Sequence, residues 1–164
     1  NVDTRLSRLA GGDFDGLVLA AAGLRRLGRG DEIAFEFEPE QLTPAPGQGA
    51  LILECRLDDP VESRAQTITD RGALATVSCE RAAVAALEAN CNTSVGVHAE
   101  LTPGGRMRTR GFCGLPDGSE WIRDELELDA SEPEALGRAL AERMAAAGAT
   151  ELLARAAERA RVSG

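Results

Sequence analysis

One cysteine, Cys91, lies where a long helical pattern stops, in the run LEANCNTSVG. This position predicts an exposed loop between a helix and a strand, where a thiol could carry a covalent group. Because the end of a helix carries partial negative charge, we do not expect the helix to activate Cys91 as a thiolate. The alternative is a small apolar side chain in a core, as most free cysteines are, but the Asn-rich surroundings favour exposure.

Arginines of the N-terminal third form a second group of candidate functional residues, because their positive charge can attract anions. Residues 1–29 carry five arginines and three acids, although the whole chain has a formal charge of −9. A small anionic molecule would be drawn to this region by its local positive charge. Binding to nucleic acid or to an anionic membrane needs a basic face, so the acidic balance of the chain argues against both as partners.

A loop rich in proline and glycine lies at 43–50, with the sequence TPAPGQGA. Its prolines fix φ and its glycines permit tight backbone approach, which predicts a hinge-like crossing between elements. Gln48 lies between the glycines. The pattern is similar to the start of a dinucleotide-binding loop, but Ile52 occupies the place of the third glycine, so a dinucleotide site is poorly supported.

The cysteines and the histidine do not suggest a metal site. The four cysteines are widely spaced without a C-x-x-C pair, and His98 is the sole histidine. Neither zinc nor a disulfide framework is therefore expected, and a reducing cytoplasm fits best. The apolar stretches are too short to cross a membrane, and the first residues lack the layout of a signal peptide. We expect a cytoplasmic protein without metal.

The elements that must position these residues differ between the two parts of the chain. In the first part, Asp3 or Thr4 can cap a short helix that ends at Gly11-Gly12. Continuous apolar runs then predict buried strands, and alternating apolar residues predict a half-exposed strand, which together indicate an α/β arrangement. The strands are expected at 15–23, 33–37 and 51–57, and further helices at 23–26, 60–69 and 70–89.

The second part has a different pattern of strands, turns and helices, which predicts a small α+β domain. Strands separated by PGG and PDG turns form an antiparallel meander of three strands, and Ala-rich helices follow. The strands are expected at 95–102, 106–115 and 120–128, and the helices at 132–147 and 149–161.

Other arginines lie within these elements. Arg81 falls in an otherwise apolar helical stripe, so we expect a buried side chain with a partner that ties the helix across a domain boundary. Arg106, Arg108 and Arg110 share one strand face and form a basic patch. A solvated surface is favoured over a ligand site for this patch.

Four runs in a fixed order give a resemblance to a known family: NVDTRLSRL, LAAAGLRRLG, LTPAPGQGALILECRLDD, and CERA followed by LEANCNTSVG. They closely resemble porphobilinogen deaminase, also called hydroxymethylbilane synthase, over essentially the whole chain and most weakly over 113–164. Where the family usually shows two glycines before the cysteine, this chain has Ala89 and Asn90. We expect Asn90 to adopt the left-handed conformation after the helix and Ala89 to keep ordinary helical angles.

The resemblance implies a transferase of tetrapyrrole biosynthesis. The family joins porphobilinogen units head to tail into hydroxymethylbilane and releases ammonia, on a dipyrromethane cofactor held through a thioether. By position the attachment residue is Cys91, whose polarizable sulfur captures the electrophile that porphobilinogen leaves when it loses ammonia.

The resemblance also implies roles for residues outside the cysteine loop. Arg5 and Arg26 match positions that hold the acid groups of cofactor and substrate, and forked guanidinium groups suit this task. Ala20 and Gly23 offer close backbone approach to the cofactor, or simply pack under a helix. Gln48 lines the substrate cleft, or its loop serves only as a hinge.

The family enzyme is about twice as long as this chain and folds as three domains, the first two resembling bilobed periplasmic binding proteins. By resemblance, residues 1–42 are the second half of domain 2, and 43–67 are the hinge and return segment of domain 1. Residues 68–164 are the C-terminal domain to which the cofactor is attached.

The upstream part in which the family keeps its catalytic aspartate has no counterpart among these residues. We therefore expect a fragment, a cleavage product or one part of a split enzyme, inactive alone and needing an N-terminal partner. The alternative is a catalytically silent module, derived from the enzyme, that binds polycarboxylates or a protein partner.

Overall fold

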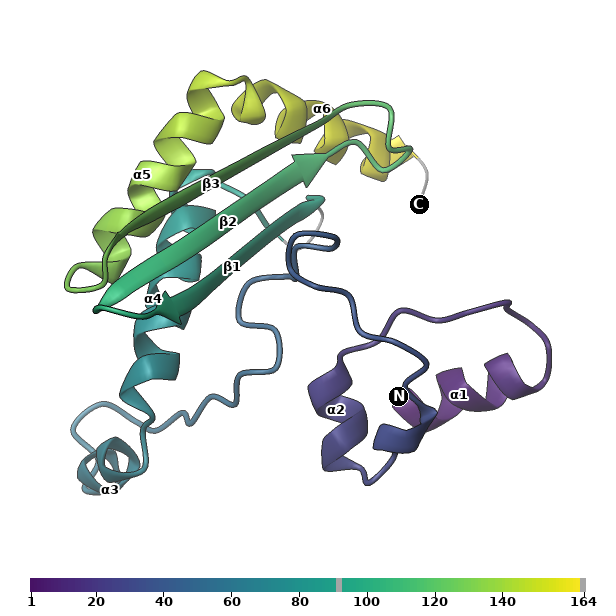
Figure 1. Ribbon diagram of the computed structural model, residues 1–164, viewed down its shortest axis with the longest axis horizontal. Helices are drawn as coiled ribbons and strands as arrows, with labels where there is room; N and C mark the ends of the chain where they lie inside the picture. The colour runs from purple at the N-terminus through teal and green to yellow at the C-terminus, as the bar shows by residue number, and fades with distance from the viewer. Residues whose placement is uncertain (91–92, 163–164) are drawn as a thin grey trace. The chain divides into compact units, whose positions relative to one another are not determined.

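The computed structural model describes residues 1–90 and 93–162, with 161 and 162 described by their backbone alone. The chain divides into two compact units, Asn1–Phe37 and Glu38–Gly164. The β-sheet and the longer helices belong to the second unit (Figure 1).

The first unit begins with helix α1 (Val2–Ala10). The side chain of Asn1 caps it by accepting a hydrogen bond from the Asp3 amide at 2.9 Å. Asp3 and Thr4, which the sequence suggested as caps, therefore lie inside the first turn. Asn1 takes this role because its carbonyl oxygen reaches the second helical N–H, which has no partner within the helix. The helix ends at Gly11, close to where the sequence predicted.

The rest of the first unit consists of short elements joined by ion pairs. Helix α2 (Ala21–Arg26) is followed by a 3-10 turn, η1 (Gly30–Glu32). The Arg29 guanidinium lies 2.6 Å from Asp3 and 2.9 Å from Glu32, and so joins α1 to η1. Leu24 is the one residue of the first unit that is buried, so this unit has little apolar core of its own.

The strands predicted at 15–23, 33–37 and 51–57 are wrong. These segments are irregular, and the first of them runs into α2. The apolar side chains of residues 51–57 are exposed, with Leu51 and Ile52 at 79% and 76%. A strand needs a neighbour to pair its backbone N–H and C=O groups, and none of the described strands pairs with these segments. The α/β arrangement expected for the first part is thus absent from the described residues.

Apart from the absent strand at 51–57, the second unit matches its predicted elements closely. Helix α3 (Val61–Thr67) precedes helix α4 (Arg71–Ala86), which begins where the Asp70 side chain accepts a hydrogen bond from the Ala73 amide. The strands β1 (Val95–Thr102), β2 (Arg106–Gly114) and β3 (Trp121–Asp129) form an antiparallel sheet in the order β1-β2-β3. Helices α5 (Pro133–Ala146) and α6 (Ala149–Val162) complete the predicted α+β domain.

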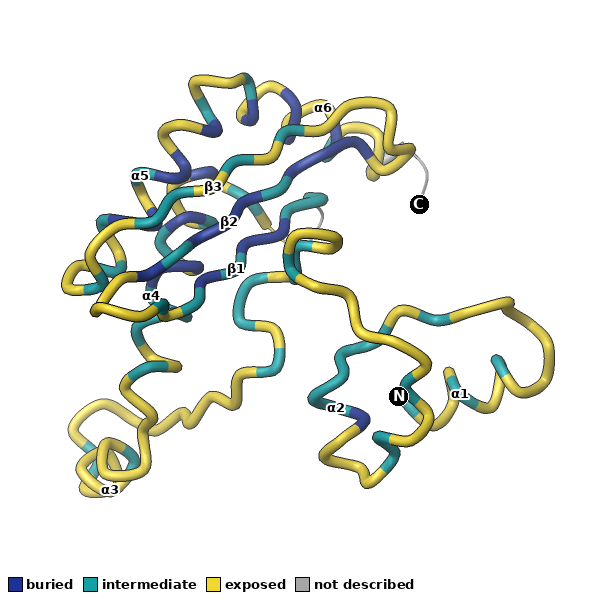
Figure 2. The backbone as a smooth tube through the Cα atoms, viewed as in Figure 1, coloured by how far each residue is buried: buried dark blue, intermediate teal, exposed yellow. Residues whose placement is uncertain are grey.

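One face of the sheet packs against α4, α5 and α6 (Figure 1). Alternate strand residues such as Val97, Met107 and Cys113 point to the helices and are fully buried, as the period of a strand requires. Val97 and Cys113 share a core cluster with Leu140 and Met144 of α5, and Met107 shares a second cluster with Leu136 of the same helix. Figure 2 shows the dark buried segments gathered on these elements. Most charged residues of the strands lie on the opposite face, whereas Asp124 of β3 lies on the helix-covered face and pairs with Arg143 of α5.

Helix α4 ends earlier than the sequence predicted. Leu87 is its C-cap, and Glu88 follows with a φ of 52°, in the left-handed region. The amides of Glu88 and Ala89 donate to the carbonyls of Ala85 and Val84, both at 3.1 Å, which is the Schellman arrangement. The left-handed residue is therefore Glu88 and not Asn90, because the helix unwinds two residues sooner.

Among the described helices, none combines the length and the apolar character that crossing a membrane would require.

Candidate functional site

Four of the predicted site residues lie in the first unit. Arg5 is on α1 and Arg26 closes α2, and both side chains are exposed. The Arg5 amide donates to the Asn1 carbonyl at 3.3 Å, so its guanidinium, and not its backbone, is available for an anion. Ala20 is the N-cap of α2, and its carbonyl accepts a hydrogen bond from the Gly23 amide at 3.0 Å.

Gln48 lies in the second unit and is exposed at the tip of a double turn. The Gln48 amide donates to the Ala45 carbonyl at 3.1 Å, and the Ala50 amide donates to the Gly47 carbonyl at 3.0 Å. Gly47 and Gly49 have φ angles of 70° and 81°, which explains the glycines on both sides of Gln48. Cys91, the predicted attachment residue, lies outside the described residues.

The Pro/Gly loop that carries Gln48 is fastened to the sheet and to α4. Glu80 accepts a hydrogen bond from the Gly47 amide at 2.6 Å through one carboxylate oxygen and from the Ala99 amide at 2.9 Å through the other. The imidazole of His98 lies 3.7 Å from the same carboxylate. The role of Glu80 is not apparent from the sequence, because a single acid in a helix carries no signal for the backbone donors that it will meet.

Arg81, the neighbour of Glu80, was predicted to be buried and to tie its helix across a domain boundary. This prediction is wrong, because the Arg81 side chain is exposed while Glu80 is only 5% exposed. The buried face of α4 runs through Cys79, Glu80, Ala83 and Leu87, and a step of one residue turns about 100° away from it. The charged anchor of this helix is therefore an acid.

The predicted basic patch of β2 is an ion-pair network. Arg110 lies 2.7 Å from Glu100 on β1 and 2.7 Å from Glu125 on β3, and it also pairs with Glu40 from the segment before the Pro/Gly loop. Only 4% of Arg110 is exposed, so the solvated surface predicted for it is wrong. Although burial alone lowers the Arg110 pKa, the hydrogen bond to Glu100 and the surrounding carboxylates raise the pKa above its ordinary value.

The outer part of this network is more exposed. Arg108 lies 2.8 Å from Glu127, and Arg106 lies 2.9 Å from the same carboxylate. The antiparallel register places Arg108 between Glu100 and Glu127, so cross-strand acids neutralise each arginine. The patch therefore offers no excess positive charge to a ligand.

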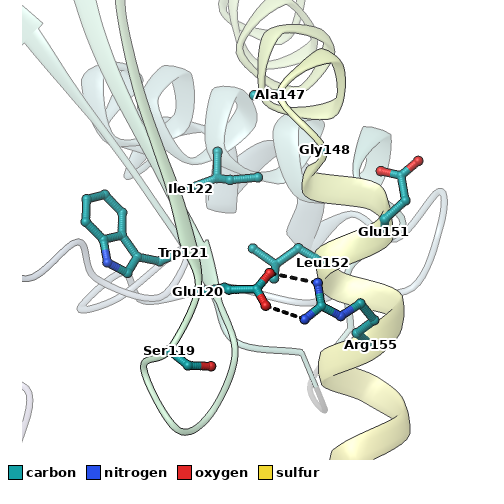
Figure 3. A pocket seen from close by; sticks show the side chains of 9 residues that line it. All are labelled: Ser119, Glu120, Trp121, Ile122, Ala147, Gly148, Glu151, Leu152 and Arg155. Atoms are coloured by element: carbon teal, nitrogen blue, oxygen red, sulfur yellow. Dashed lines mark hydrogen bonds and ion pairs between the residues drawn. The ribbon is translucent and has the colours of Figure 1, made fainter.

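An open depression lies where β3 begins and where α5 passes into α6 (Figure 3). The Arg155 guanidinium reaches across it to Glu120 with two contacts, at 2.5 and 2.7 Å. These hydrogen bonds from Arg155 lower the Glu120 pKa below its usual value. None of the predicted site residues lines the depression, and its guanidinium, that of Arg155, is already paired with Glu120.

The thiols of the described residues differ in accessibility. Cys55 is exposed, whereas Cys79 and Cys113 are buried. Burial raises the pKa of both buried thiols, which keeps them protonated and unreactive. Within residues 1–90 and 93–162, no group of histidine, cysteine or acidic residues is arranged to hold a metal ion.

Comparisons with known proteins agree on one family. The family model described as "Porphobilinogen deaminase, dipyromethane cofactor binding domain" matches residues 1–64. The model described as "Porphobilinogen deaminase, C-terminal domain" matches residues 74–146. Together the two models account for most of the chain, in the order in which the sequence motifs occur.

Individual relatives carry the same name. Porphobilinogen deaminases of Corynebacterium diphtheriae, Thiobacillus denitrificans and Thermus thermophilus are 41%, 42% and 43% identical to this chain. The matches cover 93%, 93% and 94% of the chain but 52%, 50% and 52% of the relatives, so the chain spans about half the length of the curated relatives it matches. On this ground and on the two family models, the chain belongs to the porphobilinogen deaminase family.

Proposed function

We propose that this chain provides the cofactor-binding and C-terminal parts of a hydroxymethylbilane synthase, a cytoplasmic transferase of tetrapyrrole biosynthesis. The enzyme condenses porphobilinogen units head to tail into hydroxymethylbilane and releases ammonia. The observation that carries this proposal is the pair of family models, which match consecutive stretches of the chain at 1–64 and 74–146.

Dipyrromethane is the cofactor of this reaction, and Cys91 is its proposed thioether attachment point. When bound, it supplies the pyrrole end to which the first substrate unit is joined. The chemistry of the donor set fits such a group, because Arg5 and Arg26 present exposed guanidinium groups in a region of local positive charge. Permanently charged, forked donors suit the acetate and propionate groups of successive pyrroles.

Other residues of the chain have proposed supporting roles. Ala20 and Gly23 lie at the start of α2, where a ligand ring can approach the backbone without meeting large side chains. An added Cβ at Gly23 would meet nothing within 4 Å, which is consistent with this open surface. Gln48 is proposed to contact bound substrate from the tip of its double turn.

We propose the domain division 1–42, 43–67 and 68–164 for the complete enzyme. The change from one family model to the next falls between residues 64 and 74, which supports a boundary near 67. Residues 51–57 keep their apolar side chains exposed here, and we propose that they join a sheet in the lobes of the complete enzyme. These lobes would have the periplasmic-binding-protein arrangement expected from the sequence.

Turnover is proposed to require the half of the family enzyme that this chain does not span. The relatives are about twice as long as the matched region. By the resemblance, the catalytic aspartate belongs to the part of the relatives that this chain does not span. The experiment compares porphobilinogen consumption by the chain alone and by the chain supplied with that half. A normal rate for the chain alone would overturn this part of the proposal.

Intact mass spectrometry tests the cofactor assignment. In the complemented enzyme, a mass increase of two linked pyrroles should map to Cys91 and disappear in Cys91→Ser. The matched control is Cys55→Ser, which removes an exposed thiol and should keep the added mass. An unmodified wild-type protein that still binds a polycarboxylate would instead support a silent binding module.

Arginine variants test the proposed acid-group contacts. Arg5→Ala and Arg26→Ala should each raise the KM for porphobilinogen by roughly tenfold, the factor that a lost charged hydrogen bond commonly costs. Arg8→Ala is the control on the same helix, because Arg8 is engaged with Asp13 at 2.9 Å. Equal effects of all three substitutions would contradict specific roles for Arg5 and Arg26.

A further inference from the structure

Glu80 is a charged side chain in the interior of the second unit, with 5% of its surface exposed. A buried carboxylate is costly unless its oxygens are hydrogen-bonded. Here each oxygen accepts from a backbone amide of a different segment, Gly47 at 2.6 Å and Ala99 at 2.9 Å. The carboxylate of α4 thus joins the Pro/Gly loop to strand β1.

Residues that precede Gly47 in the loop also lie close against the domain. A Cβ added to Gly96 of β1 would lie 2.5 Å from the Thr43 carbonyl oxygen and 3.0 Å from that of Pro44. Only glycine at position 96 therefore permits the loop to lie directly on the strand. Glycine is needed at position 96 because the loop lies so close, and not because the strand itself needs a glycine there.

The segment before the loop is held as well. Glu40 pairs with the buried Arg110, and its carbonyl oxygen accepts a hydrogen bond from Arg123 at 2.9 Å. From Glu40 to Gly47, the chain is therefore fixed to the sheet and to α4 at several points. These contacts hold residues 40–47 in place, so this segment is not a freely bending hinge in the second unit.

We propose that Glu80 is a positioning residue of the enzyme, which holds the Gly47-Gln48 turn in one place against α4 and β1. This inference rests on the proposed function, in which Gln48 contacts the bound substrate. Gln48 follows directly after the anchored Gly47, so a shift of the Gly47 amide moves the side chain of Gln48. Glu80 acts through this turn and does not itself touch the substrate.

The chemistry of the contact requires a carboxylate. Both partners of Glu80 are backbone N–H donors, and an ionised carboxylate accepts at both oxygens. A glutamine at this position would accept at one oxygen and turn its NH₂ group toward the other donor. Glu80→Gln therefore keeps the size of the side chain but breaks one of the two bonds, whereas Glu80→Asp keeps the charge and shortens the reach.

Amide hydrogen exchange tests the geometry in the complete chain. In Glu80→Gln, exchange at Gly47 or Ala99 should accelerate by about tenfold or more, the factor expected for a lost hydrogen bond to a charged acceptor. The matched control is Glu142→Gln, which removes the same charge from an exposed position on α5 and should leave both rates unchanged. Unchanged exchange at both amides in Glu80→Gln would overturn the proposal.

Kinetics of the complemented enzyme separate positioning from simple loss of folding. Glu80→Gln should raise the KM for porphobilinogen by about tenfold with a smaller change in kcat, because a binding contact is displaced. Glu80→Asp should recover part of this loss. A purely structural role would lower the active fraction, so a fall in apparent kcat at unchanged KM in both variants would also overturn the proposal.

Loss of the proposed function and loss of the positioning role of Glu80 would give different results. If the wild-type complemented enzyme carries no pyrroles and does not consume porphobilinogen, the proposed function fails, while the exchange rates still report on the Glu80 contacts. If the wild type is active, and if the KM and the exchange rates of Glu80→Gln equal those of the wild type, then only the proposed positioning role of Glu80 is overturned.

Discussion

Gly137 of α5 lies directly against the backbone of Cys79 of α4. A Cβ added to Gly137 would come within 2.1 Å of the Cys79 carbonyl oxygen and 3.0 Å of the Ala83 nitrogen. The two helices can approach this closely only because Gly137 has no side chain. This crossing brings Leu136 and Leu140 onto the sheet and fixes the position of α4, on which Glu80 lies.

Gly137→Ala should destabilise the second unit by about 1–3 kcal/mol, because the helices must separate to admit a methyl group. Urea denaturation followed by circular dichroism measures the change in the free energy of unfolding. Glu142→Ala, on the exposed side of the same helix, is the control and should change this free energy little. Equal stability of Gly137→Ala and wild type would contradict the close crossing.

Acid should weaken the Glu120–Arg155 pair at the depression. The hydrogen bonds from Arg155 lower the folded-state pKa of Glu120, so its stabilising contribution is present above the unfolded-state pKa. That contribution is lost as the pH falls through the lower, folded-state pKa. Carbon NMR titration of the Glu120 carboxylate should give a pKa below that of a model peptide.

Arg155→Ala should return the Glu120 pKa toward its ordinary value, since the main cause of the shift is removed. Glu151 lines the same depression and supplies an internal comparison, because both hydrogen bonds from Arg155 go to Glu120. A Glu120 titration that is identical in wild type and Arg155→Ala would contradict the pairing.

Thiol labelling should distinguish the cysteines of the native chain. Cys55 is exposed and should react readily with iodoacetamide at neutral pH. Cys79 and Cys113 should remain unlabelled, because burial blocks access and raises the pKa of each thiol. Peptide mapping by mass spectrometry identifies the labelled residues, and the same reaction in urea should label Cys55, Cys79 and Cys113 alike. Labelling of Cys113 at the rate of Cys55 in the native chain would refute its burial.

Glu88→Gly should stabilise the chain by up to about 1 kcal/mol. Glu88 adopts a φ of 52°, which strains a residue with a Cβ but suits glycine. Thermal unfolding compares this variant with Glu88→Ala, which removes the same carboxylate and keeps the strain. An unfolding temperature for Glu88→Gly no higher than that of Glu88→Ala would show that the turn is not strained.

The local patterns of the sequence were sufficient for most of the second unit. The turns PGG and PDG contain Gly104, Gly105 and Gly118, all with positive φ, and they place the strands between them correctly. Asp70 and Pro133 mark the starts of α4 and α5 for reasons that act within one helical turn. The family assignment also followed from short runs of residues, because these carry the resemblance without a structure.

Contacts between distant segments were decided only by the tertiary structure. Leu51 and Ile52 have strand-like sequence, yet they form no strand because pairing needs a partner that their own pattern does not supply. Arg110 is buried because Glu40 arrives from a segment seventy positions earlier. Glu80, and not Arg81, is the buried charge of α4 because the phase of the helix is set by its packing on α5 and the sheet. Local sequence thus determined most of the helices and turns, whereas packing between elements determined which strand-like segments pair and which charged residues act together.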